Sequence, residues 1–414
     1  MDLYDLFDPF VGVTTDSRSV SEGQLFFALH GPTFDGNLFA GQALSKGARA
    51  AVVDRGDVVV RGDDRYVVVD DTLRALQGLA LQHRRRMKTP IVQITGTNGK
   101  TTTKELVAQC LSSKLNVVAT QGNLNNHIGV PLTLLRLLPQ TEVAVVETGA
   151  NHPGEIGELT RLVEPQMGIV TNIQKAHLEG FGTLATIART KTALYDYLRR
   201  TGGTVVYNSA DPMLSRLSRG AKRVAYGADE GCRLVEGNPC TVEWHGLRIE
   251  TRLVGGYNAP NIAAALKIGE LFGVGDAPLK QALESYVPRL GRSQIVKTGR
   301  NTIVLDAYNA NPSSMRVALQ NFFTLRSSHK AVVLGQMNEL GEASAREHQA
   351  LIDTLALLND GTLERVVLVG SNFDGCNLKG LPITDLSSLD SLSGYTILIK
   401  GSNSNHLDRL VERL

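Results

Sequence analysis

The chain has 414 residues, of which 42% are hydrophobic and 20% are charged, and its formal net charge is +2. A chain of this length predicts roughly two to four domains, each with enough apolar residues for a core of its own. The nearly balanced charge argues against nucleic acid as a partner, and no apolar run approaches the about 18 residues that a membrane span needs.

The N-terminal segment, residues 1–85, reads as a small α/β unit. Short apolar runs, QLFFAL, AAVVD and RYVVVD, alternate with glycine-rich turns and one helical pattern, FAGQALSKGA. The polar strings Thr14–Arg18 and His30–Asn37 adjoin these strands, where ligand-holding groups often occur, although their residues are also simple turn formers. The charged run His83–Lys88 predicts a helix end and a linker with its charges in solvent.

The segment TGTNGKTTT has the form of a phosphate-binding loop, because it follows the apolar strand IVQI and opens the helical pattern KELVAQCL. Gly96 and Gly99 permit tight turns, and the free N–H groups of a helix N-terminus attract an anion. In that geometry Lys100 reaches the β- and γ-phosphates of ATP, and the Thr101 hydroxyl ligates magnesium. The loop is shorter than the general P-loop, and an ordinary strand-to-helix turn is the alternative. The expected ATP-binding residues are Thr95, Gly96, Thr97, Asn98, Gly99, Lys100, Thr101 and Thr102.

Residues 86–296 predict a parallel sheet with helices on both faces. The strand patterns IVQIT, NVVAT, VAVVET, GIVTNI and TVVYN are each followed by turn signals or a helical pattern. Ligands of such sheets bind at the carboxyl ends of the strands. Glu147 ends one of these strands beside the phosphate loop, so it is a candidate magnesium ligand, with a salt-bridged loop glutamate as the alternative.

Several other polar residues of this segment have ordinary interpretations. His177 follows the strand GIVTNI, where a lone histidine is more often a hydrogen-bonded polar side chain than a ligand. Lys191 lies in the helical pattern TLATIARTKTALYDYL, where lysine is usually solvated. Asn125 and Asn126 fit turn and cap positions before a helix started by Pro131. Farther along the chain, after a β-rich insertion, Asn258 fits the N-cap of a helix whose first turn contains proline.

Residues 297–414 predict a second α/β sheet. The strand TIVLD ends at Asp306, a turn follows at Tyr308 and Asn309, and Pro312 opens a helix. The patterns KAVVLG, RVVLVG and YTILIKGS then alternate with helices. No G-x-G-x-x-G motif is present, so we do not expect a nicotinamide cofactor.

Taken together, these strings resemble the Mur ligase family. The loop GTNGKTT is shared with the related folylpolyglutamate synthases, whereas TDSR, LFFAL and G-x-x-x-D-G resemble a nucleotide-sugar domain that those relatives lack. The resemblance covers essentially the whole chain and implies an α/β protein of three domains. These are a small N-terminal UDP-substrate domain (1–85), a central P-loop, parallel-sheet ATP-binding domain (86–296) and a C-terminal Rossmann-like acceptor domain (297–414).

The same resemblance implies roles for individual residues. The string A-H-L-E-x-F-G implies that His177 helps hold a second magnesium ion, and Lys191 would become a carbamate that supports the same ion. Asn258 and Asn261 would lie on the adenine side, and Arg292, in the string LGRSQ, would approach the phosphates. Asp306 would hold the ATP ribose across a domain cleft, which must close around one ATP. The implied catalytic residues are Lys100, Glu147, His177, Lys191 and Arg292; the implied metal ligands are Thr101, Glu147, His177 and Lys191; the implied substrate-binding residues are Ser17, Arg18, Asn125, Asn126, Tyr308 and Asn309.

The strings GNLNN-x-IGVP-x-TLL and DAYNANPSSM are closest to the family members that add D-alanyl-D-alanine. The resemblance therefore implies an ATP-dependent amide ligase that joins this dipeptide to UDP-N-acetylmuramoyl-tripeptide through an acyl phosphate in cytoplasmic peptidoglycan synthesis. Two Mg²⁺ ions would assist, and we expect a monomer. The scattered cysteines agree with a cytosolic protein that keeps its thiols reduced.

Four positions depart from the family pattern, namely Gln174, Ala307, Gln336 and Asn403. The last two lie in the expected acceptor domain, where aspartate and arginine are usual. They leave open a sister ligase that adds a single amino acid, or a noncatalytic paralogue that binds a nucleotide sugar. A folylpolyglutamate synthase is contradicted by the N-terminal segment.

Overall fold

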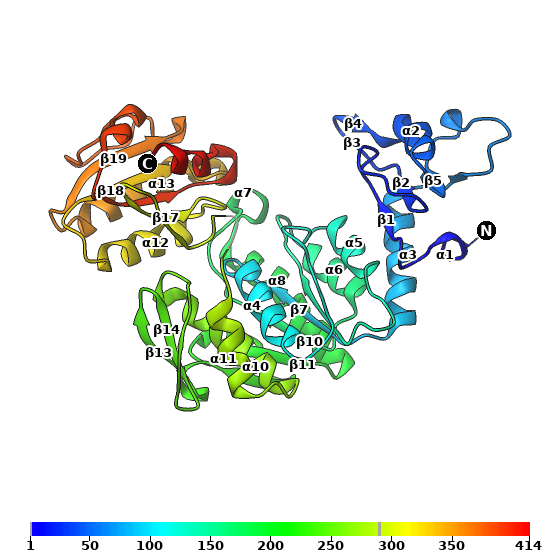
Figure 1. Ribbon diagram of the computed structural model, residues 1–414, viewed down its shortest axis with the longest axis horizontal. Helices are drawn as coiled ribbons and strands as arrows, with labels where there is room; N and C mark the ends of the chain where they lie inside the picture. The colour runs from blue at the N-terminus through cyan, green and yellow to red at the C-terminus, as the bar shows by residue number, and fades with distance from the viewer. Residues whose placement is uncertain (1, 289–290) are drawn as a thin grey trace.

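The computed structural model describes residues 2–288 and 291–414, in which three α/β domains follow one another along the chain. The N-terminal and C-terminal domains lie on opposite sides of the central domain (Figure 1). Every helix in the described part of the chain is too short or too polar to cross a bilayer. Leu290, the first residue of the string LGRSQ, lies outside the described residues.

The N-terminal domain is built on a parallel sheet of order β1-β2-β5-β6. The residues of β2 and β5 are buried, because helices and loops cover both faces of these strands. Its elements are α1 (Leu3–Leu6), β1 (Val13–Thr14), β2 (Leu25–Phe27), β3 (His30–Gly31), β4 (Phe34–Asp35), α2 (Ala40–Ser45), β5 (Ala50–Val53), β6 (Tyr66–Val68) and α3 (Thr72–Met87).

Helix α3 joins this domain to the next, and its charged end is not wholly solvated, contrary to our prediction. His83 and Arg84 are buried. The Arg84 guanidinium donates hydrogen bonds to the carbonyl oxygens of Val163 and Glu164 at 2.9 and 3.0 Å. These carbonyls end a helix of the central domain, where a cation is favoured by the unpaired carbonyl groups.

The central domain contains the predicted parallel sheet, in the order β12-β11-β10-β7-β9-β8. The predicted strands are all present, and the edge strand β12 was not predicted. The strands are β7 (Ile91–Thr95), β8 (Val117–Ala119), β9 (Val143–Glu147), β10 (Met167–Val170), β11 (Thr204–Asn208) and β12 (Lys222–Tyr226). The helices are α4 (Lys100–Ser112), α5 (Gly129–Leu134), α6 (Glu155–Val163), α7 (Leu178–Phe181), α8 (Leu184–Thr201), α9 (Pro212–Leu217), α10 (Ala259–Leu271) and α11 (Asp276–Ser285).

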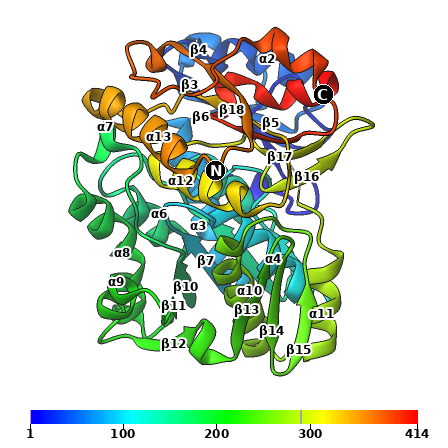
Figure 2. The same ribbon diagram turned by 90° about the vertical axis from the view of Figure 1, so that its left-hand side faces the viewer.

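The start of α5 differs from our prediction, whereas the β-rich insertion is present. The helix expected to start at Pro131 begins at Gly129, because the Asn126 side chain accepts hydrogen bonds from the N–H groups of Ile128 and Gly129. The β-rich insertion is confirmed as an antiparallel sheet packed beside α10 and α11 (Figure 2). Its strands are β13 (Cys232–Gly237), β14 (Cys240–Trp244) and β15 (Leu247–Glu250). The cysteines are free.

The C-terminal domain has a sheet of order β16-β17-β20-β18-β19, which is parallel except for β16 at the edge. Helices α12 and α13 pack on one face, and the segment Leu407–Arg413 packs on the other. Strand β16 crosses the expected boundary at residue 297. The elements are β16 (Gln294–Lys297), β17 (Thr302–Asp306), α12 (Pro312–Thr324), β18 (Lys330–Gly335), α13 (Ser344–Leu358), β19 (Leu363–Val369) and β20 (Thr396–Lys400).

Candidate active site

A cavity of about 620 Å³ lies between the central and C-terminal domains. It lies where the phosphate loop faces the loop that follows β17, so Lys100 and Asp306 line one space although different domains carry them. The predicted site residues that line it are Thr97, Asn98, Gly99, Lys100, Thr101, Thr102, Asn258, Asn261, Arg292, Asp306, Tyr308 and Asn309.

The phosphate loop connects β7 to α4, as the sequence predicted. Gly96 has φ +148° and Gly99 has φ +77°, a region that favours glycine. A Cβ atom on Gly96 would lie 1.9 Å from the Thr171 hydroxyl, so only glycine fits there. The Lys100 ammonium donates to the Thr97 carbonyl at 3.0 Å. Burial lowers the pKa of Lys100, while the Glu147 carboxylate acts in the opposite direction.

Glu147 ends β9 directly beside this loop. Its Oε1 accepts hydrogen bonds from Thr101 Oγ1 at 3.1 Å and from Asn125 Nδ2 at 2.7 Å. Its Oε2 is buried and has no hydrogen-bond partner among the described residues. A buried carboxylate oxygen without a donor is costly, and together with the Thr101 hydroxyl it forms the oxygen-rich surroundings that Mg²⁺ prefers. These residues therefore fit the expected magnesium ion.

Lys191 projects from α8 toward the loop and is only 2% exposed, so the solvated alternative is wrong for this lysine. Its Nζ donates to the Gly96 carbonyl at 2.9 Å. Burial, and after it the charge of Lys100, lowers the pKa of Lys191 to about 7. A large share of this amine is therefore neutral near pH 7, which is the form that reacts with carbon dioxide.

His177 has a different environment. It precedes α7 with a left-handed backbone, φ 48°, and its Nδ1 is hydrogen-bonded to a Glu339 carboxylate oxygen of the C-terminal domain. The Phe181 ring neighbours both expected ligands of the second ion, with its centroid 6.0 Å from Lys191 Nζ and 6.4 Å from the His177 ring. Within residues 2–288 and 291–414, no three His, Cys, Asp or Glu side chains are grouped to hold a metal.

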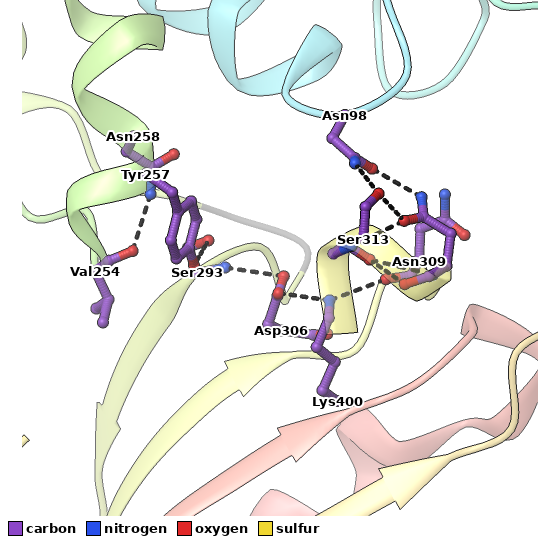
Figure 3. Close-up of polar contacts among 11 residues, drawn as sticks. Asn98, Val254, Tyr257, Asn258, Ser293, Asp306, Asn309, Ser313 and Lys400 are labelled. Atoms are coloured by element: carbon purple, nitrogen blue, oxygen red, sulfur yellow. Dashed lines mark hydrogen bonds and ion pairs between the residues drawn. The ribbon is translucent and has the colours of Figure 1, made fainter. Parts of the chain in front are cut away.

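Asn258 and Asn261 brace the phosphate loop from the first turn of α10. Asn258 occupies the predicted cap position, but its side chain donates to the Val254 carbonyl instead of capping the helix (Figure 3). Asn261 Nδ2 donates to Asn258 Oδ1 at 3.0 Å, and Asn261 Oδ1 accepts from Thr103 Oγ1 at 3.1 Å. Both amides are buried and hydrogen-bonded within the protein.

The C-terminal wall of the cavity is held by an ion pair between the buried Lys400 and the partly exposed Asp306. Lys400 Nζ donates to Asp306 Oδ2 at 2.6 Å and to the Asn309 carbonyl at 3.1 Å (Figure 3). The Arg292 guanidinium stacks over the Tyr308 ring at 3.5 Å. Arg292 Nε is buried without a hydrogen-bond partner among the described residues, so this cation has an unused donor next to the cavity.

Four polar side chains link the phosphate loop to α12, and we name Asn98, Gln174, Asn311 and Ser313 the amide cluster. Asn98 Nδ2 donates to Ser313 Oγ at 2.9 Å and to Gln174 Oε1 at 2.8 Å. Asn98 Oδ1 accepts from Asn311 Nδ2 at 2.8 Å. The loop that holds phosphate and the start of a C-terminal-domain helix are therefore hydrogen-bonded directly, as Figure 3 shows for Asn98 and Ser313.

Some predicted residues lie outside this cavity. Asn126 accepts hydrogen bonds from the N–H groups of Ile128 and Gly129 in the turn before α5, whose N-cap is Ile128. Ser17 and Arg18 lie in the N-terminal domain, which Figure 1 shows apart from the C-terminal domain. Ser17 is buried, whereas Arg18 is exposed and pairs with Asp16 at 2.8 Å.

Several residues of the cavity were not predicted as site residues. Gln174 was named only as a departure from the family pattern, Lys400 was part of a strand pattern, and Asn311 and Ser313 were neighbours of Pro312. Asn208 ends β11 at the carboxyl edge of the sheet, and that position is a signal that would have found it.

The fold and site define a nucleotide-binding protein with a short phosphate loop whose cavity is completed by a C-terminal domain. Three family models match the chain, the Mur ligase family catalytic domain at residues 9–84, the Mur ligase middle domain at 94–269 and the Mur ligase glutamate ligase domain at 291–378. The chain belongs to the Mur ligase family.

Individual relatives agree with this assignment. The UDP-N-acetylmuramoyl-tripeptide--D-alanyl-D-alanine ligase of Bacillus subtilis is 34% identical over 87% of this chain and 80% of its own length. A crystal structure of MurF from Acinetobacter baumannii has a TM-score of 0.86 at 29% identity and covers 97% of this chain and 92% of that one. MurF from Thermotoga maritima, solved in complex with ADP, has a TM-score of 0.83 at 26% identity over 98% of both chains.

Proposed function

We propose that this protein is an ATP-dependent ligase that adds D-alanyl-D-alanine to UDP-N-acetylmuramoyl-tripeptide through an acyl phosphate, in peptidoglycan precursor synthesis. The observation that carries the proposal is the cavity that Lys100 of the central domain lines together with Arg292, near the boundary between the domains, and Asp306 of the C-terminal domain. The curated relatives that bear this ligase's name supply the identity of the two substrates.

The first step activates the tripeptide carboxylate. One carboxylate oxygen attacks the γ-phosphorus of ATP, the bond from that phosphorus to the β,γ-bridging oxygen breaks, and ADP leaves. The ammonium of Lys100 and the guanidinium of Arg292 would stabilise the charge that spreads over the transferred group. Asp306, which pairs with Lys400, would accept hydrogen bonds from the ribose hydroxyls, and Asn258 and Asn261 would lie on the adenine side of the cavity.

The second step forms the amide. The dipeptide amine attacks the activated carbonyl carbon, the bond from that carbon to the phosphate oxygen breaks, phosphate leaves, and the nitrogen gives up a proton. Thr101 and Glu147 would hold a magnesium ion, which would neutralise charge on the phosphate oxygens when bound. Carbamylation of Lys191 would turn a cation into an anion beside the phosphate loop, whereas His177 is bonded to Glu339, so no step is assigned to a second ion.

The other expectations form part of the same proposal. Residues 1–85, with Ser17 and Arg18, would bind the UDP-linked substrate; residues 86–296 would bind ATP; and residues 297–414 would bind the acceptor, with Asn125, Asn126, Tyr308 and Asn309 as further substrate contacts. ATP and a UDP-linked precursor are cytoplasmic substrates, so the enzyme would act in the cytoplasm. The enzyme would act as a monomer.

The test is phosphate release by the purified protein with ATP, Mg²⁺ and UDP-N-acetylmuramoyl-tripeptide, with and without D-alanyl-D-alanine. We expect release that requires the dipeptide, and no turnover in Lys100→Met, because the transition state loses a buried cation. Release supported only by single amino acids would point to a sister ligase and would refute the dipeptide as acceptor.

A further inference from the structure

A second cavity, of about 330 Å³, adjoins the phosphate end of the first. It lies between the segment that follows β10 and the two helices α12 and α13. Gln174 and Ser313 line both cavities, and both accept hydrogen bonds from Asn98 of the phosphate loop. One layer of side chains therefore separates the second cavity from the loop that would hold the γ-phosphate.

The second cavity combines two cations with an apolar wall. Lys175 and Arg316 line it, and neither side chain makes an ion pair or hydrogen bond with another residue of the described chain. Glu347, an acid on the same wall, pairs instead with Arg346 at 3.2 Å. Leu184 and Leu351 supply apolar surface. Two cations without counter-ions beside a cavity raise its potential and attract an anion.

We propose that this cavity binds the acceptor, with its carboxylate on Arg316 and Lys175 and its amine at the wall formed by Gln174 and Ser313, whose side chains would move aside for the amine to reach the activated carbonyl. This inference rests on the proposed ligase function. Arg316 follows Ser313 by three residues on α12, so both side chains lie on one face of the helix, about 4.5 Å apart along its axis. An extended dipeptide spans about 7 Å at most, so its carboxylate reaches the cations while its amine stays at the shared wall.

The chemistry of the lining selects a particular class of acceptor. The guanidinium of Arg316 matches a carboxylate in a bidentate manner, and Lys175 adds a second charge. The apolar surface of Leu184 and Leu351 suits methyl side chains. A small zwitterionic dipeptide of alanines satisfies these features. Gln174 adds an amide to the wall between the two cavities.

The experiment compares two acceptors in the phosphate-release assay, D-alanyl-D-alanine and D-alanyl-D-alaninamide, which lacks the carboxylate. The enzymes are wild type, Arg316→Ala, Lys175→Ala, the double variant and Arg316→Lys. The control is Arg326→Ala, because Arg326 is an exposed arginine just beyond the end of the same helix.

We expect Arg316→Ala to raise KM for the dipeptide about 10- to 100-fold, as for loss of one charge-assisted hydrogen bond, with the double variant weaker still. KM for ATP and for the UDP-linked substrate should stay within about twofold. Wild type should prefer the dipeptide to the amide by a similar factor, and Arg316→Ala should lose that preference. Arg316→Lys should recover part of the affinity, and Arg326→Ala should match wild type.

Two results would overturn the assignment of this cavity while leaving the ligase function intact. One is an active wild type with Arg316→Ala and Lys175→Ala indistinguishable from Arg326→Ala. The other is an equal rise in KM for the dipeptide and the amide, which would show that the carboxylate is not what Arg316 contacts. A wild type whose phosphate release does not depend on the dipeptide would refute the proposed function, and this inference with it.

Discussion

Replacing Lys191 by methionine tests whether a buried, neutral lysine lies under the phosphate loop. In the folded protein the pKa of Lys191 falls from its ordinary 10.5 to about 7, chiefly because the ammonium is buried. Between these two values the unfolded chain binds a proton that the folded protein does not bind. The free energy of unfolding of wild type therefore rises with pH across this window, and the full penalty applies below pH 7.

The magnitude follows from the two pKa values. One pKa unit corresponds to about 1.36 kcal/mol, so wild type should gain about 3 kcal/mol relative to Lys191→Met between pH 7 and pH 9.5. Methionine also loses the hydrogen bond to the Gly96 carbonyl. The loss of this hydrogen bond changes the difference in free energy of unfolding between the two proteins by a constant amount. It does not change how that difference depends on pH.

The chain has one tryptophan, Trp244, which is buried in the core of the central domain. Its fluorescence during urea unfolding therefore reports on the domain that contains Lys191. The buffers are purged of carbon dioxide, so that Lys191 stays an amine. Lys222→Met is the control, because Lys222 is an exposed lysine on β12 of the same domain.

We expect the Lys222→Met curve to run parallel to wild type from pH 7 to 9.5, while the Lys191→Met curve diverges. If the difference between wild type and Lys191→Met is constant across this range, Lys191 keeps its proton when folded, and the argument for a carbamate-forming amine fails.

Three further substitutions test the walls of the ATP cavity. Gly99→Ala should weaken ADP binding at least about tenfold in a titration, because Gly99 has φ +77° and the new Cβ would lie 2.7 Å from Asn261 Oδ1. Unchanged ADP binding would show that the phosphate loop adjusts to the added methyl group. Asn261→Ala should lower the free energy of unfolding by about 1–3 kcal/mol in the same fluorescence assay, since the Thr103 hydroxyl loses a buried hydrogen-bond acceptor. A loss below about 0.5 kcal/mol would show that Asn261 does not stabilise the phosphate loop. Lys400→Met should destabilise the C-terminal domain by about 1–3 kcal/mol in calorimetry, because the partly buried Asp306 carboxylate loses its cation. An unchanged transition would show that the pair is dispensable.

The sequence predicted the features that are encoded locally. The phosphate loop, the strands of the central sheet and the helix after Pro312 follow from short patterns of glycine, apolar runs and caps. Strand β12 was missed because its first residues, Lys222 and Arg223, are exposed at the sheet edge and give no apolar pattern.

Contacts between distant residues were beyond the same reasoning. Lys400 and Asp306 are 94 positions apart, and no local sequence pattern around either residue predicts their contact. Arg84 looked like part of a solvated charge run, yet it is buried because a helix end from another part of the chain offers it carbonyl groups. Side-chain burial of this kind is decided by tertiary packing rather than by local composition.

The amide cluster joins the central and C-terminal domains through hydrogen bonds between Asn98 and both Asn311 and Ser313, whereas the bond from Asn98 to Gln174 stays within the central domain. The two bonds between the domains are neutral and each has a net value of about 0.5–1.5 kcal/mol, so together they favour the closed arrangement by about 1–3 kcal/mol. A free-energy difference of this size is one that a bound ligand can shift. Because Asn98 belongs to the phosphate loop, we expect that separation of the two domains would also remove two hydrogen-bond partners from this loop. Opening of the cleft and release of the phosphates would then be coupled through the Asn98 side chain.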